Sequence, residues 1–350
     1  MRFPLPAWLL LPIVLAAAPL RAQQTAADPA ASPPSGNSAA PAQPAIVDLQ
    51  QVVVSGAQPG PGMWKVSDAQ GHVLWVLGTL SPLPKRMEWR SQDVEAAIAS
   101  SQEVLSAPYA ALDSGRGFFG TLLLLPSLLK ARQNPDGKTL REVLPPEQYA
   151  RWQALKARYI GGDRGVEKWR PIFAAQELYE AAMRRSGLSQ DPIVQKLVAD
   201  TARRHGVVQV KSVVTVRLDD PRGALKEFRR TALGDGECFA RTLDRIDGDM
   251  RNIRARANAW AVGDIEQLRR IPSGDQYGAC VAAVTQTGLA HKLGIDDLNQ
   301  RAIDHWMELA QAALAKNAST FSTLTMALAL QQDGPLQRLA ARGYTVEAPE

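Results

Sequence analysis

Histidine is scarce in this sequence, and the spacings that mark common metal sites are missing. The 350 residues include four histidines and two cysteines. No His-x-x-x-His and no Cys-x-x-Cys pattern occurs, although a catalytic divalent metal usually needs about three ligands drawn from His, Asp, Glu and Cys. The sequence therefore excludes the familiar local motifs of zinc enzymes.

A dominant charge and a long apolar run are missing as well. Lysine and arginine number 40 against 35 acidic residues, and the small excess is spread too evenly to indicate nucleic-acid binding. The apolar run near the N-terminus, Leu9 to Ala18, is too short to cross a bilayer as a helix. We therefore expect no nucleic-acid partner, and no transmembrane span once a leader is removed.

Residues 1–22 have the features of a secretory signal peptide, with a short apolar core and a weak cleavage site that ends at Ala22. An uncleaved N-terminal anchor is the alternative. Residues 23–62 are rich in Ala, Pro, Ser, Gly and Gln and carry few charges, which predicts a disordered linker. We expect one folded domain over residues 63–350, in the periplasm or outside the cell.

The two cysteines, Cys238 and Cys280, form an even pair in a chain with a predicted secretory leader. An oxidising compartment favours a disulfide between them. Closing a loop of about 40 residues would contribute roughly 3–4 kcal/mol by the chain-entropy estimate. The alternative is two buried thiols.

The clearest strand is the continuously apolar, partly β-branched run from Val73 to Leu77, which is typical of a fully buried strand. Gly78 and Pro82 end it. Residues 63–67 are expected to pair with it as a hairpin around the turn at 68–71. The corner after Leu77 is the carboxyl end of a strand, where ligands bind in open α/β sheets.

The rest of the chain alternates between helical and strand patterns. We predict helices at residues 93–104, 145–159, 171–183, 192–205, over most of 225–268, at 298–314 and around 336–339. We predict strands from residue 104, at 207–216 as a strand or hairpin, at 319–324 and at 344–346. This order indicates an α/β fold whose central mixed sheet is built from N- and C-terminal strands, with large helical insertions.

Residues 118–129 form a run of twelve mostly apolar residues. A dip into a membrane is one interpretation. A buried helical hairpin split by Pro126 is the other, and the length of the run favours it.

The hairpin followed by Gly78-Thr79-Leu80-Ser81 resembles the start of the TraB/GumN family, which is related to the Tiki metallopeptidases. The family motif is Gly-Thr-x-His, and its histidine is a metal ligand. Here Ser81 stands in that place.

The C-terminal part is similar to the same family. A strand from Phe321, the pair Asp333-Gly334 and the ending Gly343 to Val346 follow the family order. Residues 263–268 fit its Gly-Asp-x-x-x-Leu pattern, and Arg301 with Trp306 fits its Arg-Asn-x-x-x-Trp helix in part, because alanine replaces the asparagine.

The resemblance implies a divalent metal whose ligands are changed in this chain. Counted back from Asp333, the family glycine falls on Thr325 and its second histidine on Leu328, and the family glutamate falls near Ser106. We therefore expect no bound cofactor and interpret the chain as a divergent member that lacks the family histidines. The positions of the vestigial site are Gly78, Thr79, Ser81, Ser106, Arg301, Thr325, Leu328 and Asp333.

Two functions from different classes remain open. The first is a non-catalytic binding or structural module of the cell envelope, with an envelope protein, peptide or glycan as partner. The second is a metallopeptidase-like hydrolase with a remodelled site that uses Ser81, Asp333 or Arg301. Ser81 would need a base and an orienting group within reach, and its surroundings are not a Gly-x-Ser-x-Gly elbow, so the sequence favours the non-catalytic module.

Overall fold

The computed structural model describes residues 60–349, with gaps at residues 86, 249 and 272–275. The predicted signal peptide and most of the predicted linker lie outside the described residues. Within the described part of the chain, no helix combines the length and the apolar character that crossing a bilayer requires.

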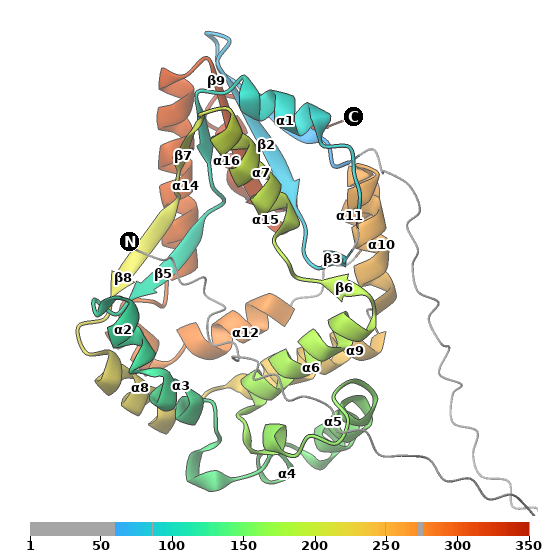
Figure 1. The fold of residues 1–350 in the computed structure, drawn as a ribbon, viewed down its shortest axis with the longest axis vertical. Coiled ribbons are helices and arrows are strands. Elements are labelled where there is room, and N and C mark those ends of the chain that lie inside the picture. The colour runs from blue at the N-terminus through green and yellow to red at the C-terminus, as the bar shows by residue number, and fades with distance from the viewer. Residues whose placement is uncertain (1–59, 86, 249, 272–275, 350) are drawn as a thin grey trace, which may run out of the picture.

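The main sheet has six strands, drawn from both ends of the domain (Figure 1). They are β1 (Met63–Ser67), β2 (Val73–Thr79), β4 (Glu103–Leu105), β7 (Val208–Val210), β9 (Ser319–Thr325) and β10 (Thr345–Glu347). Their order in the sheet is β10-β1-β2-β9-β4-β7. β1 is antiparallel to β2 and β10, whereas β2, β9, β4 and β7 run parallel. The predicted α/β fold with a mixed central sheet is confirmed.

Helices pack against this sheet and close its core. They include α1 (Gln92–Ala99), α7 (Ile193–Arg204), α14 (Leu298–Lys316), α15 (Met326–Leu330) and α16 (Pro335–Ala340). α14 buries Trp306, Met307, Ala310 and Leu314, the face that its spacing predicts. Complete burial of a leucine or methionine side chain is worth about 1.5–3 kcal/mol. The Trp306 indole also donates a hydrogen bond to Ser322 Oγ (3.2 Å), which fixes α14 to β9.

The first helix is shorter than predicted. It ends at Ala99, and not at residue 104, because the hydroxyls of Ser100 and Ser101 donate to the Ala97 carbonyl (3.1 and 2.7 Å). Such local bonds satisfy carbonyls that a continuing helix would use. The chain then enters β4 at Glu103.

The segment predicted as one strand or hairpin at residues 207–216 forms two strands of different sheets. β7 pairs with β4, and β8 (Val213–Arg217) pairs with β5 (Tyr109–Asp113), in both cases in parallel. Ser106 lies between β4 and β5, Ser212 lies between β7 and β8, and the Ser106 Oγ accepts a hydrogen bond from the Ser212 backbone N–H (3.0 Å). The two segments of the chain therefore leave the main sheet side by side at the ends of β4 and β7.

A second apolar core lies among helices inserted between the strands. It is formed by α4 (Leu140–Val143), α5 (Pro146–Tyr159), α6 (Pro171–Arg185) and α9 (Asp235–Gly248). Trp152 of α5 packs on Phe239 of α9 with ring centroids 5.6 Å apart. The predicted helical insertions thus have a core of their own.

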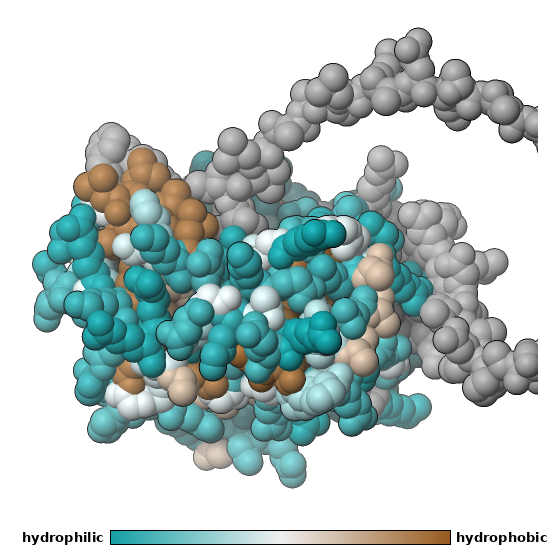
Figure 2. Space-filling view, turned by 90° about the horizontal axis from the view of Figure 1, so that it is seen from below, coloured by the Kyte–Doolittle hydropathy of each residue, from teal (hydrophilic) through white to brown (hydrophobic). Residues whose placement is uncertain are grey.

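The apolar run at residues 118–129 is not the buried hairpin that we predicted. It forms two short helices, α2 (Gly117–Leu122) and α3 (Leu125–Ala131), and α3 packs beside α8 (Pro221–Arg230). Leu124 and Ala131 are buried, but Leu122 and Leu123 are exposed. Figure 2 views this end of the molecule and shows an apolar area bordered by hydrophilic residues. Helices this short bury one side only, so the remaining leucines face solvent.

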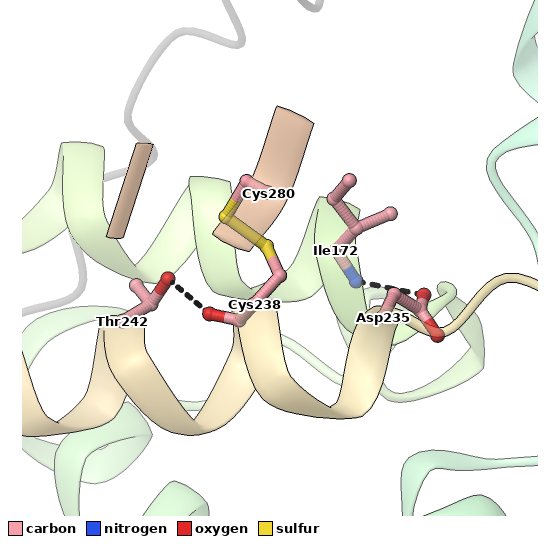
Figure 3. The surroundings of a disulfide bond; sticks show 5 residues. All are labelled: Ile172, Asp235, Cys238, Thr242 and Cys280. Atoms are coloured by element: carbon pink, nitrogen blue, oxygen red, sulfur yellow. Dashed lines mark hydrogen bonds between the residues drawn. A yellow bond between two sulfur atoms is a disulfide. The ribbon is translucent and has the colours of Figure 1, made fainter. Parts of the chain in front are cut away.

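Cys238 of α9 and Cys280 of α12 (Gln276–Thr285) form a disulfide (Figure 3), as predicted. Cys238 is fully buried. One turn away on α9, the Asp235 carboxylate accepts a hydrogen bond from the Ile172 backbone N–H (3.1 Å), which fixes α9 to the start of α6. The bridge therefore anchors α12 to a helix of the second core.

The remaining short elements connect these parts. They are β3 (Leu83–Pro84), which pairs with β6 (Leu188–Ser189), the 3₁₀ turns Pro135–Gly137 and Gly165–Lys168, and the helices α10 (Met250–Ala261), α11 (Ile265–Arg270) and α13 (Gly288–Lys292).

Candidate functional site

The predicted site lies where β2 and β9 end side by side. Their parallel register pairs Gly78 with Leu324 and Thr79 with Thr325. Thr79 is buried, and its hydroxyl donates to the Leu324 carbonyl (3.1 Å), 245 residues further along the chain. The structure therefore brings together the two segments that the sequence placed at one corner.

Gly78 is a packing position in this corner. A Cβ atom there would lie 2.6 Å from Met326 Cε and 2.9 Å from Trp64 Cζ3. The Trp260 indole donates a hydrogen bond to the Gly78 carbonyl (2.7 Å). The absence of a side chain lets three large residues close over the backbone.

Thr325 and Leu328 form the start of α15. Thr325 is the N-cap, and its Oγ1 accepts a hydrogen bond from the Leu328 N–H (3.3 Å). Leu328 is half-buried against the main core. The position of the family histidine is thus a helical leucine whose backbone is capped.

Asp333 is exposed, and Gly334 behind it is buried. A Cβ atom on Gly334 would lie 2.6 Å from the Leu328 carbonyl oxygen. This close contact between the α16 N-cap and α15 explains why position 334 is a glycine.

Ser106 and Ser81 lie on either side of the corner. Ser106 follows β4, which ends earlier than its neighbours. β2 and β9 extend two residues beyond the position of Ser106, or about 7 Å by strand rise. Its hydroxyl donates to the Ala107 carbonyl (3.2 Å) and accepts from Ser212 N–H (3.0 Å). Ser81 follows β2 and is exposed.

Arg301 contacts other groups. Its guanidinium donates to the Gly294 carbonyl (3.0 Å) and lies 3.5 Å from the Asp297 carboxylate. It also lines a shallow depression of about 400 Å³ between β8 and α14, together with Val213, Val214, Asp304, His305 and Glu308. Its contacts with Gly294 and Asp297 fix the start of α14.

The Gly-Asp-x-x-x-Leu segment also has a structural explanation. Gly263 has a positive φ of 77°, which favours glycine. Asp264 caps α11 by accepting from the Gln267 N–H (2.8 Å), and Leu268 is buried. These residues turn the chain from α10 into α11, and α10 carries Trp260.

Trp260 is the residue of the corner that the sequence did not reveal. Its indole reaches the Gly78 carbonyl from a helix 182 residues away in the chain. It is fully buried and packs edge-to-face against Trp89, with the ring centroids 5.8 Å apart. No spacing or motif signals a hydrogen bond of this kind, because only the tertiary fold brings the helix there.

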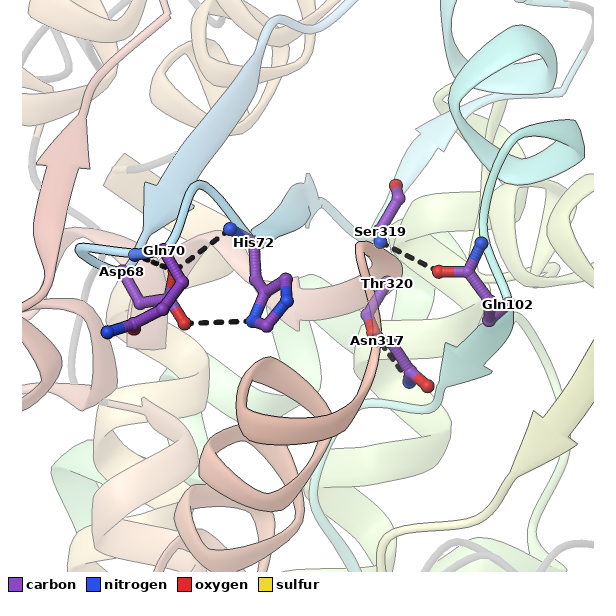
Figure 4. A network of polar contacts seen from close by, with 7 residues as sticks. All are labelled: Asp68, Gln70, His72, Gln102, Asn317, Ser319 and Thr320. Carbon is purple, nitrogen blue, oxygen red and sulfur yellow. Dashed lines mark hydrogen bonds and ion pairs between the residues drawn. The ribbon is translucent and has the colours of Figure 1, made fainter.

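Three of the four histidines, His72, His291 and His305, have carboxylate neighbours. His72 precedes β2, and its Nδ1 lies 3.0 Å from Asp68 Oδ2 at the opposite edge of the sheet (Figure 4). Burial would raise the pKa of Asp68, but hydrogen bonds from the His72 and Gln70 backbone and the His72 ring lower it below its usual value. Asp296 raises the pKa of His291 by a side-chain hydrogen bond (2.9 Å).

The same edge is closed by further polar contacts. Gln102 accepts from the Ser319 N–H (2.8 Å), and Asn317 donates to Thr320 Oγ1 (3.0 Å), as Figure 4 shows. These contacts fix the loop before β9, so the role of these side chains is structural.

The residues at the corner do not fit the divalent metal that the family resemblance implies. The hydroxyls of Thr79, Thr325 and Ser106 are bonded to backbone groups, and Leu328 offers only hydrocarbon. Among the described residues, no group of three His, Cys, Asp or Glu side chains is arranged to hold a metal ion. The corner has the contacts of a structural junction.

Comparison with protein-family models gives a match to the TraB/PrgY/gumN family over residues 62–348. Comparisons with curated proteins and with solved structures gave no match. The matched region begins just before β1 and ends after β10, so it spans the whole described fold.

Proposed function

Because the chain belongs to the TraB/PrgY/gumN family, we propose that it is a non-catalytic member, a secreted or periplasmic protein that uses the family scaffold as a binding or structural module of the cell envelope. Its partner would be an envelope protein, a peptide or a glycan. The module would need no metal cofactor.

The observation that supports this proposal most is that the hydroxyls at the corner form structural hydrogen bonds. Thr79 joins β2 to β9, Thr325 caps α15, and Ser106 joins the segments after β4 and β7. These bonds give each hydroxyl a structural role, and neutral hydroxyls are not among the His, Asp, Glu and Cys ligands that catalytic metals use. Met326 and Trp64 fill the space above Gly78 where a reacting group would need room.

The proposed compartment is supported by two features. The N-terminal residues have the composition of a secretory leader. The Cys238–Cys280 disulfide is of a kind that persists in oxidising compartments and is rare in the cytosol.

The alternative, a hydrolase with Ser81 as nucleophile, needs a general base within hydrogen-bond reach. His72 lies at the other end of β2, which is roughly 20 Å away by strand rise. The ring of His291 is engaged by Asp296, and His305 lies 3.7 Å from Glu308. A neighbouring carboxylate can orient an imidazole as a base, but among the described residues none of these three rings is hydrogen-bonded to Ser81. This favours a non-catalytic Ser81.

A peptidase assay tests the proposal. The purified mature chain would be incubated with a mixed peptide library and with Mn²⁺, Co²⁺ or Zn²⁺, beside Ser81→Ala and Asp333→Asn variants. We expect no cleavage above the rate of the variants. Cleavage by the wild type, with or without added metal, that disappears in Ser81→Ala would show that the alternative is correct.

A further inference from the structure

Three leucines at one end of the molecule are exposed to an unusual degree. Leu122, Leu123 and Leu129 have 51%, 68% and 47% of their surface exposed. They belong to α2, the link to α3, and α3 itself, so they lie close together in the chain. Figure 2, which views the molecule from below, shows an apolar area on this face. Single exposed leucines need no explanation, but a contiguous apolar area marks an interaction site.

A basic helix adjoins this area. α8 packs beside α3, and its exposed residues Arg222, Lys226, Arg229 and Arg230 follow one another at helical spacing along one face. The acidic residue Glu227 of the same helix is paired with Lys292 (2.6 Å). The end of the molecule therefore combines apolar side chains with an excess of positive charge.

We propose that the α2–α3–α8 end docks on the surface of a bilayer that contains anionic phospholipids. The leucines would enter the boundary between headgroups and acyl chains, and the basic face of α8 would lie against the phosphate groups. α2 and α3 have six and seven residues, which suits insertion at the surface and is far too short for a span. This inference concerns a surface away from the β2–β9 corner and does not depend on the proposed function.

Charge complementarity selects this occupant over a second copy of the chain. A symmetric dimer through this end would place the basic face of one α8 near that of its partner, and like charges repel. An anionic bilayer offers an apolar interior and negative headgroups together, which matches both parts of the surface.

Vesicle co-sedimentation tests the proposal with the full mature chain. The vesicles would consist of phosphatidylcholine alone or of phosphatidylcholine mixed with phosphatidylglycerol. We expect binding to the mixed vesicles that weakens as salt is added. The double variant Leu122→Ser, Leu123→Ser should reduce the partition coefficient by about tenfold or more. Because both side chains are exposed, its thermal unfolding should match that of the wild type.

A charge-matched pair of variants tests the electrostatic part. The triple variant Arg222→Gln, Lys226→Gln, Arg229→Gln should lose at least about tenfold in binding to the anionic vesicles. The control triple variant Arg203→Gln, Arg241→Gln, Arg269→Gln removes the same charge from exposed sites elsewhere and should bind like the wild type.

Three results would overturn the proposal. The first is no binding of the wild type to anionic vesicles, and the second is equal binding by the leucine variant. The third is sedimentation velocity that shows a wild-type dimer converted to a monomer by the leucine variant, which would identify a second copy as the occupant.

Discussion

Removal of the Cys238–Cys280 disulfide should lower the stability of the domain substantially. The bridge joins α9 to α12 across a sequence separation of 42 residues. We would compare the oxidised wild type with the double variant Cys238→Ala, Cys280→Ala and with the wild type kept reduced. The reduced protein keeps both sulfur atoms, so it separates the effect of the bridge from the volume lost at the buried Cys238.

The expected magnitude follows from loop closure. A loop of this length removes about 13 cal/mol/K of entropy from the unfolded chain, or about 4 kcal/mol at room temperature. Unfolding entropy scales as about 2.1 cal/mol/K per residue, which gives about 0.6 kcal/mol/K for a domain of this size. The reduced protein should therefore unfold about 6–7 °C below the oxidised one. A domain stability of about 5–15 kcal/mol makes this loss easy to detect.

Urea denaturation followed by tryptophan fluorescence is the suitable assay, because Trp152 packs on Phe239 of α9 beside the bridged helix. We expect a lower midpoint for both the reduced protein and the double variant, with the variant somewhat lower again. Identical midpoints for oxidised and reduced protein would refute the reasoning, since the bridge would then contribute nothing to folding.

Three further substitutions test particular contacts. Trp260→Phe should cost about 1–3 kcal/mol, because it leaves a buried carbonyl without its donor; chemical denaturation measures this. Gly334→Ala should cost about 1–3 kcal/mol, since the new Cβ meets the Leu328 carbonyl, whereas Gly288→Ala, with open space around it, should be nearly neutral in the same assay. Burial raises the pKa of Glu180 above its ordinary value of 4.5, against the lowering effect of a hydrogen bond from a neighbouring glutamine. The folded state therefore disfavours the ionised Glu180 carboxylate. The free energy of unfolding of the wild type falls as the pH rises through the pKa of Glu180 in the folded protein. The Glu180→Gln variant should be the more stable protein at neutral pH, and its advantage should shrink as the pH approaches 4.5; an advantage independent of pH would contradict this.

Strand β2 of the main sheet was predictable because its sequence carries a strong local signal. The apolar run over residues 73–77 has no stable position except inside a sheet, and β2 is found there with Leu74, Val76 and Leu77 buried. The pairing of β2 with β9 was predictable from the order of the family motifs, which no local pattern could supply.

Other features depend on tertiary contacts that a local pattern does not encode. Residues 207–216 are β-branched throughout, so their composition could not show that β7 and β8 pair in different sheets. The leucines of α2 and α3 looked like a core sequence, but the helices are too short and too near the surface to bury all of them. The hydrogen bond of Trp260 to Gly78 likewise depends on where α10 packs.

Metal content tests the proposed loss of catalysis most directly. The wild type would be dialysed against Mn²⁺, Co²⁺ or Zn²⁺, freed of loose ions and measured by elemental analysis, beside Ser81→Ala and the double variant Ser81→His, Leu328→His. Because Ser81 and Leu328 stand where the family has histidines, and Ser106 stands near its glutamate, we predict far less than one metal ion per wild-type chain. We predict more in the double variant, which regains two imidazoles. One tightly held ion per wild-type chain that is lost in Ser81→Ala would contradict the non-catalytic function.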